Sequence, residues 1–176
     1  MLTLSNTLKF TALAALLALA ACTTKPKQTA EEAPPVAPPA QTSGGMSQGS
    51  VVAGSIQDFR VNVGDTVHFE YNAYSVSDDQ KAILQRQATW LQRYPQVRVT
   101  VEGHCDERGT REYNLALGAR RANSVKEYLV SVGVSSARVD TISYGKERPI
   151  CTESNEGCWE QNRRGVTTIV SGATTS

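Results

Sequence analysis

Residues 97–133, VRVTVEGHCDERGTREYNLALGARRANSVKEYLVSVG, decide the fold class of this chain. Valines alternate with polar residues from Val97 to Val101, which predicts a half-buried strand. A polar, turn-like loop follows over residues 103–110. Apolar side chains then recur at steps of three and four, so we predict a helix that begins near Arg111 and ends at Gly133, a typical helix-terminating residue.

The sequence before this stretch predicts one more strand and one more helix. Residues 67–71, VHFEY, alternate between apolar and polar types, as the residues of a strand do. Ser77 and Gln80 have the spacing of a capping box, which predicts the start of a helix. Apolar residues follow at helical spacing until Pro95, which ends the predicted helix.

The sequence after the central helix predicts two further strands, over residues 139–144 and 166–170. The predicted order is therefore β-α-β-α-β-β within residues 51–176. This order indicates an α/β domain, an α+β sandwich, with one mixed sheet and helices mainly on one face.

The composition excludes several classes of protein. Of the 176 residues, 40% are hydrophobic and 20% are charged, with 18 basic and 17 acidic side chains. This balance argues against a protein that binds nucleic acid through bulk charge. The apolar stretch from Phe10 to Ala21 is too short for a mature transmembrane helix, and the length of the chain excludes a large multidomain enzyme.

Residues 1–21 have the organisation of a secretory signal peptide, with Lys9 before an apolar run that small residues close. Leu19 to Cys22 resembles a bacterial lipobox, in which the cysteine is acylated; an ordinary signal peptide that contains a cysteine is the alternative. Three acyl chains would give stable anchoring. Thr23 stands where an inner-membrane retention signal would have aspartate. We therefore expect an outer-membrane lipoprotein whose domain faces the periplasm.

Residues 22–50 are expected to form a disordered tether behind the acylated cysteine. Four of the seven prolines lie between Glu31 and Ala40, and glycines follow, so little in the segment can pack. Proline-rich chain extends by about 3.1 Å per residue, which gives a reach on the order of 80 Å. The tether indicates a target away from the membrane, unless it is a linker of no particular length. Residues 51–176 form the predicted globular domain.

The predicted domain resembles the OmpA-like family of cell-wall-binding domains, in particular its lipid-anchored, peptidoglycan-associated members. The segments that carry the resemblance are residues 101–114, 117–123, 143–149 and 161–164. The resemblance implies a noncatalytic, monomeric protein that binds the peptide stem of peptidoglycan noncovalently. It also implies that the protein acts together with periplasmic proteins of the Tol system in cell division and in maintaining envelope integrity. No metal or cofactor is implied beyond the lipid on Cys22.

The resemblance assigns the family's ligand-binding carboxylate and arginine to Asp106 and Arg121. Peptidoglycan stems commonly carry diaminopimelate, whose free end is a zwitterion. An arginine can donate two parallel hydrogen bonds to the carboxylate of that end, and an acidic side chain suits its ammonium group. The alternative is that Asp106 only caps a turn and Arg121 is a solvated helix residue. Arg120 is expected at the surface or facing a partner.

Three further candidate residues fall on family positions. Asn114 is expected chiefly to bond loop backbone near the start of its helix, with a ligand contact as the alternative. Asn72 is a candidate hydrogen-bonding contact, although residues 70–73, EYNA, depart from the typical charged pattern of the family. Of the pair Arg163 and Arg164, we take Arg164 as a candidate for the carboxylate side of the groove; packing of its stem on the sheet is the alternative.

The cysteines of the predicted domain favour a disulfide over a reactive site. Cys151 and Cys158 flank a short polar loop, which in an exported protein predicts a bridge between them. Cys105 then remains as an inert, mostly buried thiol. A peptidoglycan-degrading enzyme that uses His104, Cys105 and Asp106 is the alternative of another class, but adjacent loop residues tend to point apart. A zinc site from the same histidine and the three cysteines would lack a CxxC pair.

Overall fold

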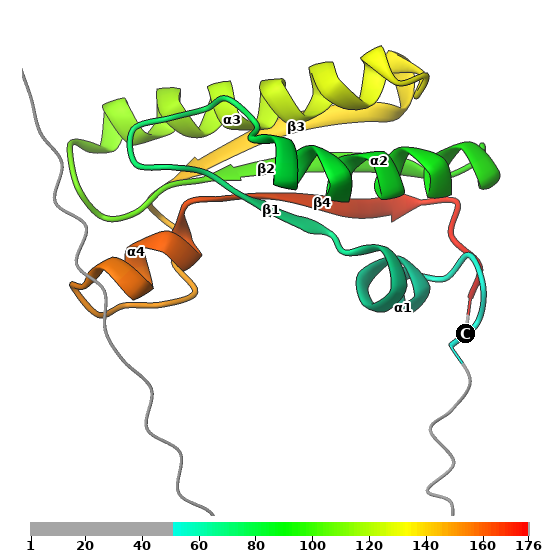
Figure 1. Ribbon diagram of the computed structural model, residues 1–176, viewed down its shortest axis with the longest axis horizontal. Coiled ribbons are helices and arrows are strands. Elements are labelled where there is room, and N and C mark those ends of the chain that lie inside the picture. Colours follow the sequence, from blue (N-terminus) through cyan, green and yellow to red (C-terminus); the bar gives the residue numbers. More distant parts are fainter. Residues whose placement is uncertain (1–50, 176) are drawn as a thin grey trace, which may run out of the picture. The chain divides into compact units, whose positions relative to one another are not determined.

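The computed structural model describes residues 51–175 (Figure 1). The expected signal peptide over residues 1–21, the acylation site Cys22 and the tether that follows it lie outside the described residues. Within residues 51–175, no helix is both long enough and apolar enough to cross a membrane.

A four-stranded mixed sheet forms the centre of the domain, as predicted. Its strands are β1 (Thr66–His68), β2 (Arg98–His104), β3 (Val139–Gly145) and β4 (Arg164–Ser171). Their spatial order is β1-β4-β2-β3. β2 and β3 are parallel and are joined through a helix, as a parallel connection requires. β4 is antiparallel to both of its neighbours, β1 and β2.

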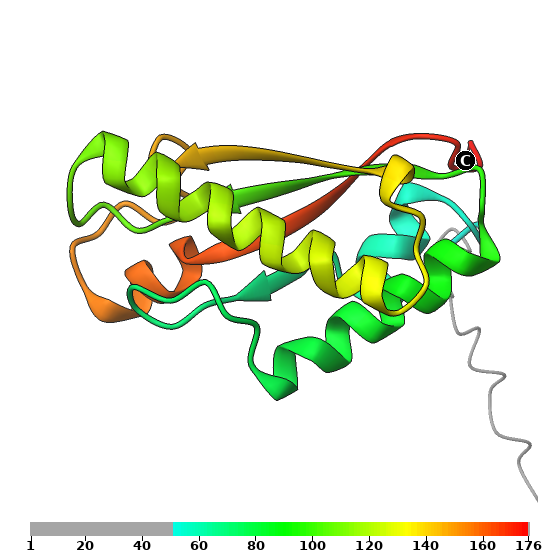
Figure 2. The same ribbon diagram turned by 90° about the horizontal axis from the view of Figure 1, so that it is seen from above.

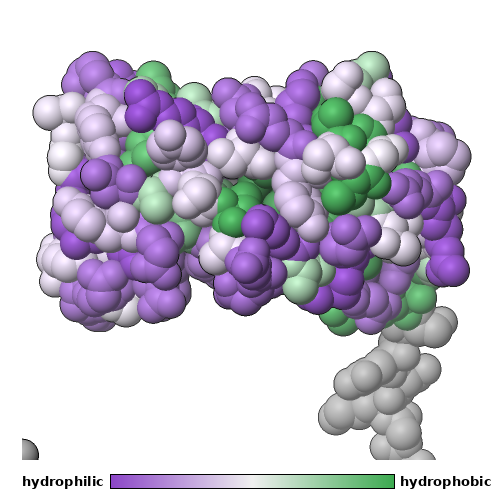
Figure 3. Space-filling view, turned by 45° about the horizontal axis from the view of Figure 1, so that its top comes forward, coloured by the Kyte–Doolittle hydropathy of each residue, from purple (hydrophilic) through white to green (hydrophobic). Residues whose placement is uncertain are grey.

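Two long helices cover one face of this sheet, α2 (Asp78–Arg93) and α3 (Arg111–Ser131) (Figures 1 and 2). The shorter helices α1 (Ile56–Asp58) and α4 (Glu156–Asn162) lie at opposite ends of the domain. A π-helical turn, Phe59–Val63, continues α1, and a 3-10 turn, Ser136–Arg138, precedes β3. The surface over the long helices is largely hydrophilic, with small and separate hydrophobic patches (Figure 3). The predicted fold class, with helices mainly on one face, is confirmed.

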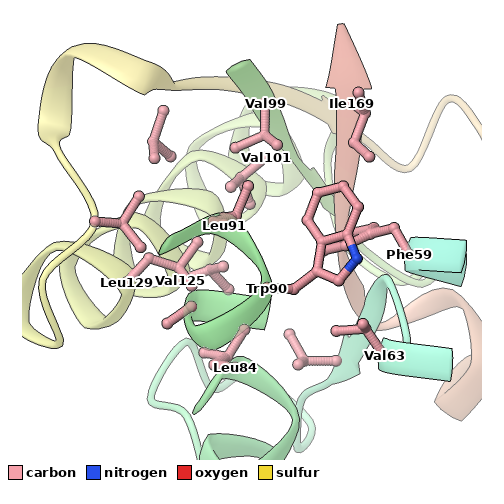
Figure 4. Close-up of a cluster of buried hydrophobic side chains, with 14 of the residues drawn as sticks. Phe59, Val63, Leu84, Trp90, Leu91, Val99, Val101, Val125, Leu129 and Ile169 are labelled. Atoms are coloured by element: carbon pink, nitrogen blue, oxygen red, sulfur yellow. The ribbon is translucent and has the colours of Figure 1, made fainter. Parts of the chain in front are cut away.

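The core lies between the sheet and the two long helices (Figure 4). Val99 and Val101 of β2 face the helices because side chains alternate between the two faces of a strand. Phe59 packs against Trp90 of α2, with 4.9 Å between the ring centroids, and extends the core toward α1. The buried apolar residues that the long helices contribute are Leu84, Ala88, Trp90, Leu91, Ala122, Val125 and Leu129.

Two predicted details of the chain before β2 differ in the structure. β1 ends at His68 instead of Tyr71, because the chain turns there and Asn72 adopts a left-handed backbone with φ of 55°. Ser77 is the N-cap of α2 as predicted, but its side chain makes no capping bond. Gln80 instead accepts a hydrogen bond from the backbone N–H of His68 at 2.8 Å, so it ties α2 to the end of β1.

The segment between β3 and β4 also differs from the prediction. The polar loop expected between the two cysteines contains the start of α4, which Asn155 caps by accepting a hydrogen bond from the N–H of Cys158 at 3.0 Å. The predicted disulfide between Cys151 and Cys158 is present. The first residues of α4 therefore lie inside a covalently closed segment, and the rest of the helix follows it.

Candidate functional site

Two loops meet the start of α3 at one end of the sheet: the loop after β1 and the loop between β2 and α3, with α4 beside them (Figure 1). They enclose a cavity of about 130 Å³. The described chain begins and ends at the opposite end of the domain (Figures 1 and 2). The residues that line the cavity are Tyr71, Asn72, Cys105, Asp106, Arg108, Gly109, Tyr113, Asn114, Leu117 and Arg121.

Asp106 is a buried carboxylate held by cations on two sides. One of its oxygens accepts a hydrogen bond from Nη2 of Arg108 at 2.6 Å, and Nη1 of Arg163 lies 3.5 Å from the same oxygen. Its other oxygen accepts from the backbone N–H of Arg108 at 3.1 Å. Burial works to raise the pKa of Asp106, but the bonds and charge of Arg108, together with the charge of Arg163, outweigh burial and hold that pKa below its usual value.

Arg121 is fully buried on α3 and joins the loop after β1 to the end of β2. Its Nε donates to the carbonyl of Ala73 at 2.8 Å, and Nη2 donates to the carbonyl of Glu70 at 3.1 Å. Nη1 donates to the carbonyl of His104 at 2.8 Å. The solvated position that was the alternative for Arg121 is therefore wrong. Because these bonds use backbone carbonyls, they do not depend on which side chains stand at residues 70 and 73.

The two candidate asparagines both line this cavity. Asn114 is buried, and its Nδ2 donates to the carbonyls of Arg108 at 2.7 Å and Thr110 at 3.1 Å, so it closes the loop before α3. This is the backbone-bonding role predicted for it. The Oδ1 atom of Asn72 accepts a hydrogen bond from the hydroxyl of Tyr113. Asparagine tolerates the left-handed backbone that this turn requires.

The two neighbouring arginines before β4 are separated by the structure. Arg163 does not line the cavity itself but contacts its carboxylate: its Nε donates to the carbonyl of Phe69 at 3.0 Å, and its Nη1 approaches Asp106 as described above. Arg164 does not line the cavity; its Nη2 donates to the carbonyl of Arg148 at 3.1 Å. Arg164 opens β4, where the next residue, Gly165, faces the helices, so its own side chain leaves the sheet on the other face. The structure thus brings Asp106, Arg121, Asn72 and Asn114 together and leaves Arg164 outside.

Arg108 is a charged residue of this site that the sequence analysis did not single out. Its guanidinium lies between the rings of Tyr71 and Trp159, with 4.1 Å to each ring centroid. Trp159 in turn donates a hydrogen bond from Nε1 to Glu107 at 3.0 Å. No local spacing marks Arg108, because its two aromatic partners come from the loop after β1 and from α4.

His104 and Cys105 do not form the nucleophilic pair that the alternative of a peptidoglycan-degrading enzyme would need. Nε2 of His104 lies 3.3 Å from Glu102, whereas the thiol of Cys105 donates to the carbonyl of Asn114 at 3.3 Å. Burial raises the pKa of Cys105 to about 11, so the thiol stays protonated at neutral pH and is a poor nucleophile. Cys151 and Cys158 are bridged, and no cluster of three or more metal-ligating side chains occurs in the part of the chain that the structure describes.

Comparison with known proteins gives one family. The OmpA family matches residues 68–163 of this chain. The peptidoglycan-associated lipoprotein of Mesorhizobium japonicum is 50% identical over 164 residues, which cover 92% of this chain and 90% of that protein. The peptidoglycan-associated lipoprotein of Agrobacterium fabrum is 56% identical over 121 residues, which cover 69% of this chain and 68% of that protein.

Solved structures agree with this result. The crystal structure of the peptidoglycan-associated lipoprotein from Burkholderia pseudomallei is 42% identical in sequence, with a TM-score of 0.59. The match covers 60% of this chain and 90% of that one. The C-terminal domain of Helicobacter pylori MotB is 25% identical, with a TM-score of 0.57, over 61% of this chain and 84% of that one.

Proposed function

The chain belongs to the OmpA family, and from its similarity to peptidoglycan-associated lipoproteins over nearly its whole length we propose that it is an outer-membrane lipoprotein that binds peptidoglycan. Its domain lies in the periplasm and ties the outer membrane to the cell wall without catalysing a reaction. The observation that carries the binding site is the convergence of Asp106 and Arg121 on one cavity of this domain.

The ligand that suits this cavity is the free end of diaminopimelate in a peptide stem. This end carries an ammonium group and a carboxylate, and we assign the ammonium to Asp106 and the carboxylate to Arg121. A carboxylate offers about four acceptor positions and an arginine five N–H groups. The bonds that Asp106 and Arg121 make among the described residues leave acceptors and donors for a ligand, so binding can add contacts without breaking the present ones. Asn72 and Asn114 lie within reach as further polar partners.

The size of the cavity limits how much of the ligand it takes. At about 130 Å³ the cavity is smaller than the roughly 300–1,000 Å³ of pockets that enclose whole small molecules. It therefore suits one zwitterionic end group, while the remainder of the stem and the glycan lie outside.

The position of the cavity agrees with an anchored wall binder. The described chain begins near α1, at the end of the domain opposite the cavity (Figures 1 and 2). A lipid on Cys22 and a tether over residues 22–50 would join the domain at that end and not at the cavity. A reach on the order of 80 Å would then bring the cavity to a wall separated from the membrane.

The remaining partners follow from the family resemblance. We assign Tol-system periplasmic proteins as protein partners and a monomer as the state of the chain. The face that Figure 3 shows is largely hydrophilic, with only small hydrophobic patches, so this face has no large apolar patch of the kind that marks a stable interface.

Sedimentation with intact sacculi tests the proposed function. The full acylated chain in detergent should sediment with sacculi in a saturable manner and should release no soluble muropeptides. Sacculi whose peptide stems have been removed by an amidase are the matched control and should not retain the protein. Equal retention by both preparations would contradict a stem ligand, and release of muropeptides would contradict a noncatalytic role.

A further inference from the structure

The side chain of Arg108 joins the three segments at the cavity end of the domain. Both faces of its guanidinium are covered, by Tyr71 from the loop after β1 and by Trp159 from α4, at 4.1 Å to each ring centroid. One edge of the guanidinium meets Asp106 at 2.6 Å, and another lies 3.7 Å from Glu156. Arg108 is therefore held in one orientation. In that orientation its shortest hydrogen bond is the one that it donates to Asp106, the carboxylate that lines the cavity.

The aromatic partner on α4 is itself held in place. Trp159 directly follows Cys158, whose disulfide to Cys151 closes the segment that precedes it. The side chain of Asn162 ties the other end of α4 to this segment, because Oδ1 accepts from the N–H of Ile150 at 2.9 Å and Nδ2 donates to the carbonyl of Cys151 at 2.7 Å. The disulfide, the capped helix and Asn162 thus fix where the indole stands.

We propose that α4 and its disulfide position the binding site: Trp159 stacks on Arg108, and Arg108 in turn orients the carboxylate of Asp106 for the ligand. Trp159 and Arg108 are positioning residues in this proposal, since they act through Asp106 and need not touch the stem. The proposal rests on the proposed function, because it concerns how the same cavity is kept ready to bind.

Releasing Arg108 would change both the geometry and the charge state of Asp106. The groups that face this carboxylate are Arg108 and Glu107 on its own loop, the thiol of Cys105 next to it, Arg163 beyond α4 and Arg121 on α3. Arg108 makes the strongest of the contacts that lower the pKa of Asp106. Without the stack, that pKa rises, and binding is lost at a higher pH as the solution is acidified.

A series of variants at Trp159 tests the proposal. The dissociation constant of the full chain in detergent for a synthetic stem tripeptide that ends in meso-diaminopimelate would be measured from pH 4 to pH 8. Stacked cations contribute roughly 0.5–2 kcal/mol, so Trp159→Leu should bind about twofold to thirtyfold more weakly and lose binding at a higher pH than the parent. Trp159→Phe retains an aromatic face and should stay closer to the parent. Gln161→Ala, an exposed change on the same helix, is the control and should match the parent.

A double-mutant cycle separates positioning from a general loss of structure. Arg108→Lys keeps the charge but loses the planar stack, so Trp159→Leu should add little further loss in that background. The paired variant Cys151→Ser/Cys158→Ser should behave like Trp159→Leu. If this paired variant does not fold, the Trp159 series and the cycle still decide the matter.

Several results would overturn the proposal. Trp159→Leu with the affinity and pH profile of the parent would do so, as would additive losses in the cycle. An equal loss for Trp159→Phe and Trp159→Leu with an unshifted pH profile would assign Trp159 a structural role only. A parent chain that does not bind the tripeptide would instead remove the proposed stem ligand, and with it the basis of the positioning role.

Discussion

The backbones of Gly103 in β2 and Gly118 in α3 are in direct contact, so that a Cβ atom added to Gly103 would overlap the carbonyl oxygen of Gly118. A Cβ on Gly118 would in turn overlap the hydroxyl of Ser143 in β3. α3 therefore lies directly on the parallel strands at this point. Arg121 follows Gly118 by about one helical turn. Because α3 lies so close to β2, the guanidinium of Arg121 reaches the carbonyl of His104 at the end of that strand.

We expect Gly103→Ala to destabilise the domain by about 3 kcal/mol or more, because the added methyl group meets backbone that cannot move independently. Urea unfolding followed by circular dichroism would measure the loss. Gly157→Ala is the control: its Cβ would have an ordinary contact of 3.5 Å with Asn155, so the free energy of unfolding should change by no more than ~1 kcal/mol. A Gly103→Ala protein as stable as the parent would contradict the close contact.

Loss of either charged partner in the cavity should abolish most binding to sacculi. Asp106→Ala and Arg121→Ala each leave one charge of a zwitterion without a partner, which costs about 2–5 kcal/mol, or roughly thirtyfold or more in affinity. Arg121→Ala should also lower stability by about 1–3 kcal/mol, because three backbone carbonyls lose their donor.

Two neighbouring substitutions make this comparison specific. Arg121→Lys retains the charge but not the two-pronged geometry, so it should bind sacculi less well than the parent. Arg120→Ala removes the adjacent, exposed cation and should sediment with sacculi like the parent. Retention of Asp106→Ala and Arg121→Ala at parental levels would show that the stem binds elsewhere.

The stability of the domain should fall as the pH drops from about 6.5 to about 4, and His104 should account for much of this slope. Burial, followed by the charges of Arg164 and Arg148, lowers the pKa of His104 to about 4 from an ordinary 6.5, although Glu102 lies 3.3 Å from Nε2. The unfolded chain takes up a proton in this range before the folded chain does. The contribution is therefore complete above pH 6.5 and is lost at ~1.4 kcal/mol per pH unit, to a total of about 3 kcal/mol.

His104→Gln should flatten this part of the curve of unfolding free energy against pH. The exposed His68 serves for comparison, and His68→Gln should leave most of the slope in place. A slope unchanged by His104→Gln would mean that another group binds the proton.

Cys22→Ser should leave the chain without acyl groups and outside the outer membrane. The reason is that residues 19–22 resemble a lipobox, and in a lipobox the sulfur of the cysteine forms the thioether to the lipid. Detergent partition and sucrose-gradient fractionation would locate the protein. The reverse result, an outer-membrane fraction equal to that of the parent, would exclude acylation at Cys22 as the anchor.

Local sequence patterns correctly predicted the ends of α2 and α3, because residues next to each helix in the sequence define them. α3 begins after Thr110, which caps it by accepting a hydrogen bond from the N–H of Tyr113, and the chain leaves it through Gly133 with φ of 102°. Pro95 follows the end of α2 as expected. α4 was missed because it is only seven residues long and depends on the disulfide and on contacts of Trp159 with the loop before α3.

The sequence by itself determined the fold class, the family resemblance and the disulfide, because periodicity, spacing and motif are properties of neighbours along the chain. Through that resemblance it also gave Asp106 and Arg121 as candidate binding residues. Only the tertiary structure decided that Arg163 approaches Asp106 while Arg164 turns to the other face of the sheet. It also decided that Arg108 is enclosed by two aromatic rings. The first outcome depends on which face of the sheet each residue of β4 occupies. The second depends on contacts between loops that are far apart in the sequence. Neither can be predicted from the spacing of residues along the chain.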